Sequence, residues 1–560
     1  MPWKTFHHNG VMFPLPYKQH NIPIICKNDD KNEKIQLTSE QEEYATIYAR
    51  YLNTEYNTEY KTFNNNFFKD WKTLFKLKLN LTSCDFSAIK KYLDKQKEQN
   101  KLLTKEQKDK NKKQKDLLTK KYKTAIVDGK SQPVGNFMVE PPSIFIGRGA
   151  HPSLGKIKWR IKSSDVTLNL SKDAPIPVPN DGGKWAAIVH EPNSYWLARW
   201  KCPITDKTKY VWLSDKSSIK GNKDMQKFEV ARKLGTIIDK MRKEIVTMTL
   251  HSKNEQERQL AVVLYLIDYF ALRIGNEKGS DEADTVGTVS LRLEHLTLLP
   301  DNKIKLDFLG KDSVRFVNIF KVTELVHKNL TSFIKGKSKD DNIFDLISTS
   351  TVNTYLSKKM KKLTARVFRT YNASKLYEQE LLSAVNGKQI KLNPIKGFSA
   401  GYLKNNERSS FLDRQSLFSN SSNTFNTSNI TNASNIIQAA AGQDRQQDQI
   451  LKIINDANIA VAVLCNHQKN VGKNDVNKIT LKEKIDKLDK NSPSYKKKIT
   501  LLKEKEKYKH LALGTSKLNY IDPRITVSFL KQFNIPVTAF FNASQIEKFA
   551  WAMDATNFRF

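Results

Sequence analysis

Residues 303–316 read KIKLDFLGKDSVRF, and this stretch decides the kind of fold to expect. Apolar side chains alternate with charged ones from Lys303 to Phe308, which is typical of a strand with one buried face. A turn signal follows at residues 310–313, and the alternation then resumes. The stretch therefore predicts a β-hairpin with Lys311 at its tip.

The sequence on the N-terminal side of this hairpin predicts both helices and strands. Apolar residues recur at helical spacing from Leu234 to Ile245 and from Leu260 to Ile267, which predicts two core helices. Residues 184–213 hold short, Trp-rich alternating segments that predict strands. We therefore expect an α+β chain with several domains.

Three segments have an unusual composition. Residues 91–123 are rich in Lys, Glu and Gln, which predicts an exposed helix, either merely solvated or facing a polyanion. Residues 473–510 keep a helical period that is broken at residues 491–493, so two charged helices in an antiparallel hairpin are expected. Residues 397–448 are rich in Asn and Ser, which predicts a disordered insertion.

Length and charge narrow the function classes. A chain of 560 residues exceeds what one core supports, so two to four domains are expected. Lys and Arg total 94 against 58 Asp and Glu, which gives a formal net charge of +36. Such a surplus indicates a polyanionic partner, although a general bias toward lysine accounts for part of it.

The cysteines and the apolar content indicate a soluble intracellular protein. The four cysteines are far apart and form no CxxC pair, so neither a zinc ribbon nor a redox dithiol is indicated, and scattered thiols suit a reducing compartment. No stretch approaches the roughly 20 apolar residues of a membrane helix, and the first residues do not resemble a secretory signal.

The sequence has no HExxH motif, no Cys/His cluster with metal spacing and no complete P-loop. A phosphodiester can nevertheless be attacked by a side chain if cationic donors and an acid assist it. Tyr520 lies in a polar stretch before a Pro-marked turn, and Arg273 follows an apolar helix just before Gly275. His467 follows an apolar run. Taken singly, each also fits a structural role: a half-exposed tyrosine, a cation at a helix end capped by the glycine, and a buried histidine.

Together, these segments closely resemble eukaryotic nuclear type IB DNA topoisomerase almost from end to end. The matching strings are long, specific and in the same order. They are residues 66–71 (NFFKDW), 147–152 (GRGAHP), 219–221 (IKG), 271–278 (ALRIGNEK), 307–313 (DFLGKDS), 368–374 (FRTYNAS), 464–468 (LCNHQ) and 513–520 (LGTSKLNY).

The resemblance implies a role for each matched residue. Tyr520 would be the nucleophile, and Lys311 the general acid for the leaving 5′ oxygen. Arg273, Arg369 and His467 would stabilise the charge that develops on the scissile phosphate. No cofactor and no metal are expected. Further DNA contacts are expected at Arg148, Asp312, Asn519, Lys220, His151 and Lys156, the first three bordering a pocket for camptothecin-like inhibitors.

The resemblance also implies an architecture, a two-lobed DNA clamp. Residues 1–228 would form a mixed α/β cap, residues 229–471 a mainly helical catalytic domain, residues 472–508 a helical-hairpin linker, and residues 509–560 a small helical domain that carries the tyrosine. The expected partner is double-stranded DNA, bound by a monomer in the nucleus and without a membrane. The family's charged N-terminal extension has no counterpart here, and Ile146 and Ala150 replace the Arg and Asn of the animal enzymes.

Two other functions remain open at this stage. A tyrosine recombinase shares an Arg, Lys, His/Arg and Tyr set, but the end-to-end match to cap, hairpin and C-terminal segment argues against it. A DNA clamp that has lost activity would fit the charge, but the five intact residues argue against that reading.

Overall fold

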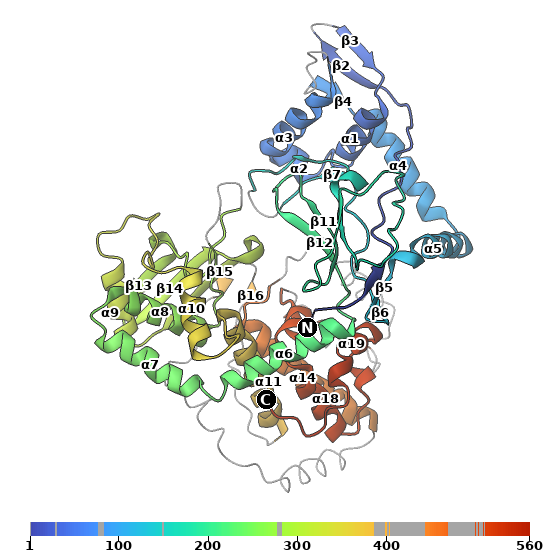
Figure 1. The fold of residues 1–560 in the computed structure, drawn as a ribbon. Coiled ribbons are helices and arrows are strands. Elements are labelled where there is room, and N and C mark those ends of the chain that lie inside the picture. The colour runs from blue at the N-terminus through green and yellow to red at the C-terminus, as the bar shows by residue number, and fades with distance from the viewer. Residues whose placement is uncertain are drawn as a thin grey trace. The chain divides into compact units, whose positions relative to one another are not determined.

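The computed structural model describes residues 2–28, 31–76, 83–147, 151–276, 283–385, 398–399, 402–403, 443–468 and 511–560, with five isolated positions between 495 and 510. The chain divides into two compact units (Figure 1). Unit 1 comprises residues 1–221 and 278–283, and unit 2 comprises residues 222–277 and 284–560. Both contain helices and sheets, which confirms the mixed α+β class.

Unit 1 is built from short strands and a few helices around two apolar cores. One core lies among small sheets, and the other packs helices against a strand pairing. The strand orders are β1 (Phe6–His8)–β5 (Thr124–Val127)–β6 (Lys130–Pro133), β10 (Ala187–Val189)–β9 (Thr167–Asn169)–β11 (Trp196–Lys201)–β12 (Thr208–Trp212), β3 (Lys31–Ile35)–β2 (Ile24–Asn28)–β4 (Cys84–Asp85) and β7 (Ser143–Ile144)–β8 (Ile157–Lys158). Helices α1 (Ser39–Ala49) and α3 (Lys61–Trp71), with α2 (Glu55–Glu59) between them in sequence, supply most of the helical side chains of the second core.

The strands expected in residues 184–213 are confirmed as β10, β11 and β12. Strand β11 buries side chains on both faces, among them Trp196 and Trp200, and the guanidinium carbon of Arg199 lies 4.8 Å from the centroid of the Trp196 ring. The Lys-rich segment 91–123 is helical and exposed as predicted, but it forms two helices, α4 (Ser87–Leu102) and α5 (Lys105–Thr119). The break falls where Thr104 caps α5 through its side chain.

The expectation of scattered thiols was wrong for one pair of cysteines. Cys26 and Cys84 are directly opposite one another on β2 and β4 and form a disulfide across 58 residues. Cys202 and Cys465 are buried free thiols. The spacing of the two cysteines in the sequence does not reveal this pairing, because it is the antiparallel register of β2 and β4 that brings them together.

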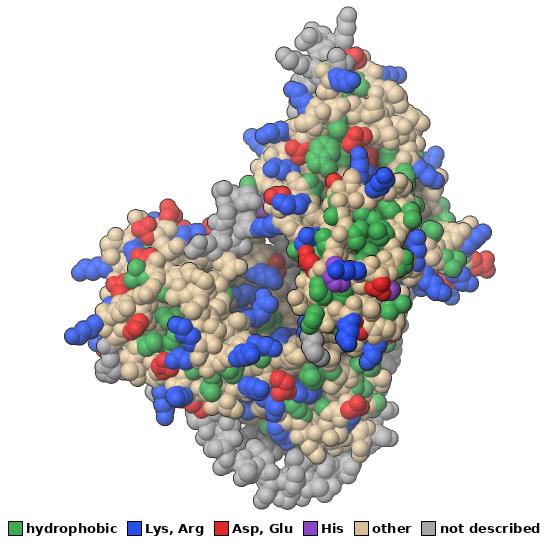
Figure 2. Space-filling model, viewed as in Figure 1, with side chains coloured by type: hydrophobic (Ala, Val, Ile, Leu, Met, Phe, Trp, Pro, Cys, Tyr) green, Lys and Arg blue, Asp and Glu red, His purple; other side chains and the backbone are tan. Residues whose placement is uncertain are grey.

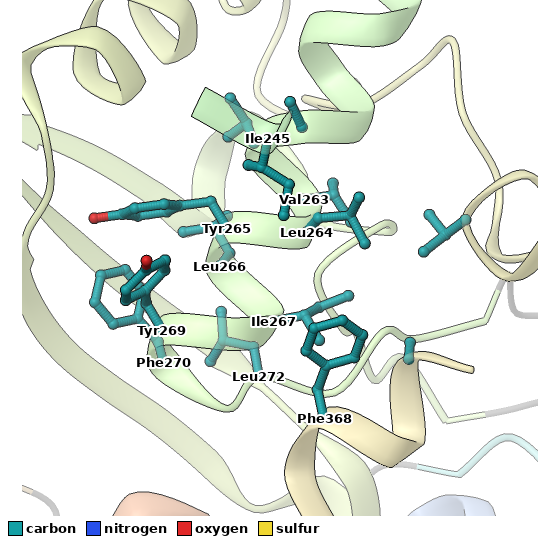
Figure 3. Packing of buried hydrophobic residues seen from close by; sticks show 14 of the residues in the cluster. Ile245, Val263, Leu264, Tyr265, Leu266, Ile267, Tyr269, Phe270, Leu272 and Phe368 are labelled. Carbon is teal, nitrogen blue, oxygen red and sulfur yellow. The ribbon is translucent and has the colours of Figure 1, made fainter. Parts of the chain in front are cut away.

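Unit 2 is built around α8 (Glu255–Phe270), whose residues are almost all buried from Gln259 onward. Figure 3 shows Ile267 of α8 beside Phe368, and Val263 of α8 near Ile245, both partners coming from other helices. The surrounding helices are α6 (Ser218–Leu234), α7 (Ile238–His251), α9 (Glu324–Phe333), α10 (Thr349–Lys359) and α11 (Ala365–Val385). This all-round burial explains why the sequence of α8 is apolar on nearly every face.

The two helices expected from periodicity are present, but the first begins later than predicted. Leu234 ends α6, and a turn at residues 235–237 precedes α7. A side chain at Gly235 would come within 3.1 Å of the Tyr371 ring. The apolar period continues through the turn because Leu234 and Ile238 bury against the same core.

The hairpin predicted from residues 303–316 is confirmed. Strands β14 (Lys303–Leu309) and β15 (Arg315–Lys321) pair antiparallel, and β13 (Leu296–Leu299) extends the sheet on the other side of β14. The alternating residues Ile304, Leu306 and Phe308 of β14 are buried in the core, whereas Leu309 at its end is exposed. The connecting turn holds Lys311 at its start, as expected.

The rest of unit 2 brings distant segments together. Helix α14 (Gln443–Leu464) packs along α11, and α17 (Leu513–Asn519), α18 (Pro523–Gln532) and α19 (Ala543–Lys548) form the aromatic-rich C-terminal segment. Most of the predicted insertion 397–448 lies outside the described residues. Of its described part, β16 (Phe398–Ser399) pairs with β17 (Tyr402–Leu403) and residues 443–448 are helical, so disorder was wrong there. The predicted hairpin 473–510 lies almost wholly outside them.

No helix within the described ranges has both the length and the apolar character to cross a membrane. Figure 2 shows Lys and Arg side chains spread over this face of both units, in keeping with the formal charge of +36.

Candidate active site

The sequence indicated that Arg273 is at the end of a helix, but in the structure it lies in the loop after α8. Helix α8 stops at Phe270 because Ala271 takes a left-handed conformation with φ 49°. Gly275 therefore does not cap the helix. The carbonyl oxygen of Arg273 instead accepts hydrogen bonds from the backbone N and the Oγ1 of Thr288, at 2.8 and 2.9 Å.

Gly275 has a different function, which is to let two loop segments approach one another. Its φ is +84°, and a Cβ there would come within 2.7 Å of the Cα of Gly287. Across the same contact, the backbone N of Val289 donates to the carbonyl oxygen of Ile274. The backbone at Arg273 and Ile274 is thus held against residues 287–289.

Arg369 projects from α11 into the floor of the site and is only 4% exposed. Its guanidinium donates to the carbonyl oxygens of Ala271 and, at 2.9 Å, of Cys465. Its Nε is buried and has no protein hydrogen-bond partner. These bonds join the loop after α8 to the end of α14 and orient the charged group toward the pocket described below.

His467 follows α14 after a tight turn in which Asn466 has a positive φ of 48°. Its carbonyl oxygen accepts from the backbone N of Ala512 at 2.7 Å, which ties the turn to the C-terminal segment. The ring is 3% exposed. Burial, together with the positive charges of Arg369 and Arg273, lowers the pKa of His467 to about 3, so the imidazole is neutral at neutral pH.

Tyr520 is half-buried directly after α17, as the sequence predicted. Its backbone N donates to the carbonyl oxygen of Ser516, and its carbonyl oxygen accepts from the Oγ of Ser374 at 2.9 Å. Its ring centroid lies 4.9 Å from that of His467, and the guanidinium carbon of Arg369 lies 5.3 Å from the same centroid. The tyrosine therefore contacts both groups.

Lys311 and Asp312 occupy the turn of the β14–β15 hairpin, and both are exposed. Asp312 and Ser313 adopt left-handed conformations, with φ of 67° and 56°. This turn brings Lys311 to the rim of the pocket that the buried groups line.

One pocket of about 110 Å³ unites these groups. That volume is below the roughly 300–1,000 Å³ typical of sites for drug-sized molecules. Burial and the positive charge of Arg369 lower the pKa of Arg273. The lining includes Arg273, Lys311, Asp312, Arg369, Cys465, His467 and Thr515. Four of the five predicted catalytic residues thus line one pocket, and the fifth, Tyr520, touches two of them.

The predicted DNA contacts are distributed over both units. In unit 2, Asp312 lies at the pocket, and Asn519 is exposed beside Tyr520 with its Nδ2 on the carbonyl oxygen of Thr515. In unit 1, Lys220 forms an ion pair with Asp215 at 3.1 Å, and the Nδ1 of His151 accepts from the backbone N of Ser153. The carbonyl oxygen of Lys156, also in unit 1, accepts a hydrogen bond from the backbone N of Phe145. Arg148 lies outside the described residues.

Sequence reasoning missed several residues that build the site. Ser516 contacts the His467 ring, and Ser374 bridges the Tyr520 carbonyl and the backbone N of Asp522. Both serines fall within the matched strings, but no sequence pattern pairs them with a partner so far along the chain. Asp268 of α8, five positions before Arg273, also forms a buried ion pair with Arg242 of α7. Within the described ranges, no group of three or more His, Cys, Asp or Glu could hold a metal ion.

Family comparisons agree with this geometry. The family model described as eukaryotic DNA topoisomerase I, catalytic core, matches residues 216–505, which is more than half of the chain. The chain belongs to the eukaryotic DNA topoisomerase I family. Two further models, described as the DNA binding fragment of eukaryotic DNA topoisomerase I and a C-terminal topoisomerase domain, match residues 1–213 and 494–560.

Individual relatives of the topoisomerase I family match over the whole chain. DNA topoisomerase 1 of Candidozyma auris is 36% identical, covering 100% of this chain and 83% of the relative. The human protein of that name is 37% identical, covering 99% and 71%. DNA topoisomerase 1 beta of Arabidopsis thaliana is 39% identical over 100% of this chain but only 59% of its own length. The chain thus spans less than two thirds of that plant relative.

Proposed function

We propose that this topoisomerase I family member is a type IB DNA topoisomerase that relaxes supercoiled DNA through a transient 3′-phosphotyrosine at Tyr520, without ATP or metal. The observation that carries the proposal is the grouping of Tyr520, His467 and Arg369 beside a small pocket that Arg273 and Lys311 also line. The names of the relatives support the same activity.

The chemistry follows from what each group can do. The Tyr520 oxygen attacks phosphorus, and its phenolic proton passes to water. The bond from phosphorus to the 5′ oxygen breaks, and that oxygen takes a proton from Lys311. One phosphodiester replaces another, so the bond energy is retained and the reverse reaction reseals the strand without a nucleotide.

The cations supply the electrostatic stabilisation. Arg273 and Arg369 stay charged at every physiological pH and can each direct two donors at the non-bridging oxygens. Because the guanidinium of Arg369 is held by the carbonyl oxygens of Ala271 and Cys465, that group needs little reorganisation when charge develops. Neutral His467 adds a hydrogen-bond donor and no further charge.

The formal charge of +36 supports double-stranded DNA as the partner, with affinity that falls steeply as salt rises. We further propose the clamp architecture with its boundaries after residues 228, 471 and 508, action as a monomer in the nucleus, and an inhibitor pocket bordered by Arg148, Asp312 and Asn519. Supercoiling would drive rotation of the free 5′ end while the protein holds the other strand end.

The deciding experiment traps the covalent adduct. Wild-type protein is mixed with a 5′-labelled duplex and quenched with denaturant, and the labelled strand should then migrate with the protein. Tyr520→Phe should bind the duplex as tightly but form no adduct, because it lacks only the attacking oxygen. Tyr371→Phe, at a buried tyrosine on α11 outside the pocket lining, is the matched control and should form the adduct normally. An adduct in Tyr520→Phe would refute the assignment.

A plasmid assay tests the remaining parts of the proposal. Relaxation of a supercoiled plasmid that carries no special sites should proceed without ATP and in excess EDTA. A tyrosine recombinase would require paired sites, and a clamp without activity would leave the plasmid supercoiled. Complete loss of relaxation on chelation would contradict the metal-free scheme.

A further inference from the structure

The ring of His467 has a polar partner on each nitrogen. Its Nδ1 lies 2.7 Å from the Oγ of Ser516, and its Nε2 lies 3.5 Å from an NH2 nitrogen of Arg369. Ser516 is fully buried, and the ring is 3% exposed. Water therefore has little access to the Nδ1 side, and Ser516 is the group that must satisfy that nitrogen.

The proton on this ring can be on only one nitrogen at a time. Burial and the charges of Arg369 and Arg273 keep the ring neutral, as its lowered pKa of about 3 indicates. A neutral imidazole has one N–H donor and one acceptor nitrogen. The two neighbours of His467 therefore decide which nitrogen holds the proton.

Without DNA, the neighbours favour a proton on Nδ1. A guanidinium has donors only, so the Nε2 that faces Arg369 is best used as an acceptor. Nδ1–H then donates to the Oγ of Ser516. A phosphate oxygen beside Nε2 reverses this preference, because it accepts and cannot donate. Nε2 must then carry the proton, and Nδ1 must accept one from a neighbour.

We propose that Ser516 is a positioning residue whose hydroxyl lets His467 change tautomer when the scissile phosphate enters, accepting from Nδ1 before and donating to it afterwards. The proposal rests on the proposed function, in which His467 contacts that phosphate. The net change moves one proton from Nδ1 to Nε2, so the ring stays neutral while the Ser516 hydroxyl turns from acceptor to donor. A hydroxyl suits this role because it can both donate and accept, and its hydrogen rotates freely.

Ser516 also connects the histidine with the nucleophile. Its carbonyl oxygen accepts from the backbone N of Tyr520 at 3.0 Å and of Ile521 at 3.1 Å. The residue that orients the His467 ring therefore also ends α17 and sets where Tyr520 leaves the helix. Substituting the side chain leaves these backbone bonds in place, which allows the hydroxyl to be tested alone.

Three variants separate positioning from packing. Ser516→Ala removes one oxygen and favours helix, so α17 should remain folded. Ser516→Cys keeps the shape but is a weaker donor and acceptor. Ser528→Ala is the matched control, since Ser528 is a buried serine of α18 that binds the backbone N of Phe558. Adduct formation with excess protein on a 5′-labelled duplex should be about tenfold slower in Ser516→Ala, which corresponds to one lost hydrogen bond.

Ser516→Cys should fall between wild type and Ser516→Ala, and Ser528→Ala should match wild type. Affinity for the duplex should be the same in all four proteins. A wild-type rate in Ser516→Ala, or a parallel loss in Ser528→Ala, would overturn the proposal. A purely structural role of Ser516 would not lower the rate of adduct formation while leaving the affinity for the duplex unchanged.

A spectroscopic test addresses the tautomer directly. The ¹⁵N chemical shift distinguishes a protonated ring nitrogen from an unprotonated one, and the signals that vanish in His467→Gln identify the residue. Free wild-type protein should show Nδ1–H. Tyr520→Phe with saturating duplex DNA should show Nε2–H, and free Ser516→Ala should show a mixture. The same tautomer with and without DNA would refute the switch. The spectra of the free proteins test the Ser516 contact even if the wild-type protein forms no adduct, which would count against the proposed function alone.

Discussion

The two halves of the candidate site differ in how the protein holds them. Arg369 and His467 are 4% and 3% exposed, the terminal nitrogens of Arg369 donate to two carbonyl oxygens, and Ser516 contacts the Nδ1 of His467. Lys311 stands on an exposed hairpin turn in which two residues are left-handed. The buried half is thus organised before any substrate arrives, whereas the exposed half keeps its charge in water.

This difference matches the work proposed for each half. Charge stabilisation is most effective when the donors are fixed in advance, because no free energy is then spent on orienting them during the reaction. Proton donation needs only reach and a proton, which a long side chain on a turn supplies. The two halves should therefore respond differently to substitution.

The largest effect is expected in the buried half. Arg369→Ala should slow adduct formation on the labelled duplex by roughly 10³-fold, because it removes a fixed charged donor at the phosphorus. It also leaves the carbonyl oxygens of Ala271 and Cys465 without their donor. Arg369→Lys should recover only a small part of the rate, since one ammonium cannot hold both carbonyls and the phosphate.

Arg366 provides the matched control for Arg369. It is exposed and lies one turn earlier on α11. Arg366→Ala should leave the rate of adduct formation unchanged in DNA-bound protein. If Arg369→Lys proved as active as wild type, the bidentate, preorganised arrangement would not be what the reaction uses.

A smaller effect, which a modified substrate should rescue, is expected in the exposed half. Lys311→Ala should slow cleavage by about 10²-fold, in the range found for general acids. The defect should disappear on a duplex whose scissile 5′ oxygen is replaced by sulfur, because a thiolate leaves without needing a proton. Arg369→Ala should stay slow on that duplex. Lys321→Ala, at the far end of the same hairpin, is the control. A Lys311→Ala protein that remained slow with sulfur would not have lost a general acid.

The sequence predicted the exposed half of the site better than the buried half. The turn that displays Lys311 follows from strand alternation and a turn signal, which are local properties. The end of α8 does not, because Ala271 has no cap signature and takes a left-handed conformation where Arg369 binds its carbonyl oxygen. Gly275, which looked like the cap, is instead required by the approach of Gly287.

The same limit applies wherever a contact joins distant residues. Ser516 and His467 are separated by 49 positions, and Cys26 and Cys84 by 58. Neither separation has a periodic signature, so only the packed chain reveals the pairs. The family resemblance grouped the five catalytic candidates although they are far apart in the sequence. It did not identify the residues that hold them in place, such as Ser516.

The smallest expected effect concerns acid and the buried half alone. An ordinary histidine has a pKa near 6.5, whereas burial first, and then Arg369 and Arg273, lower that of His467 to about 3. The His467 ring therefore takes up a proton below about pH 6.5 in the unfolded chain, but only below about pH 3 in the folded chain. Stability from the neutral ring is complete above 6.5 and is lost as pH falls through this window. Between pH 7 and 5 the free energy of unfolding should fall by roughly 2 kcal/mol, at about 1.4 kcal/mol per pH unit below 6.5.

Urea unfolding at both pH values measures this fall in stability, with His467→Gln as the comparison. His467→Gln should lose that much less stability on acidification, and an equal loss in both proteins would mean that the ring is charged or solvated in the folded state.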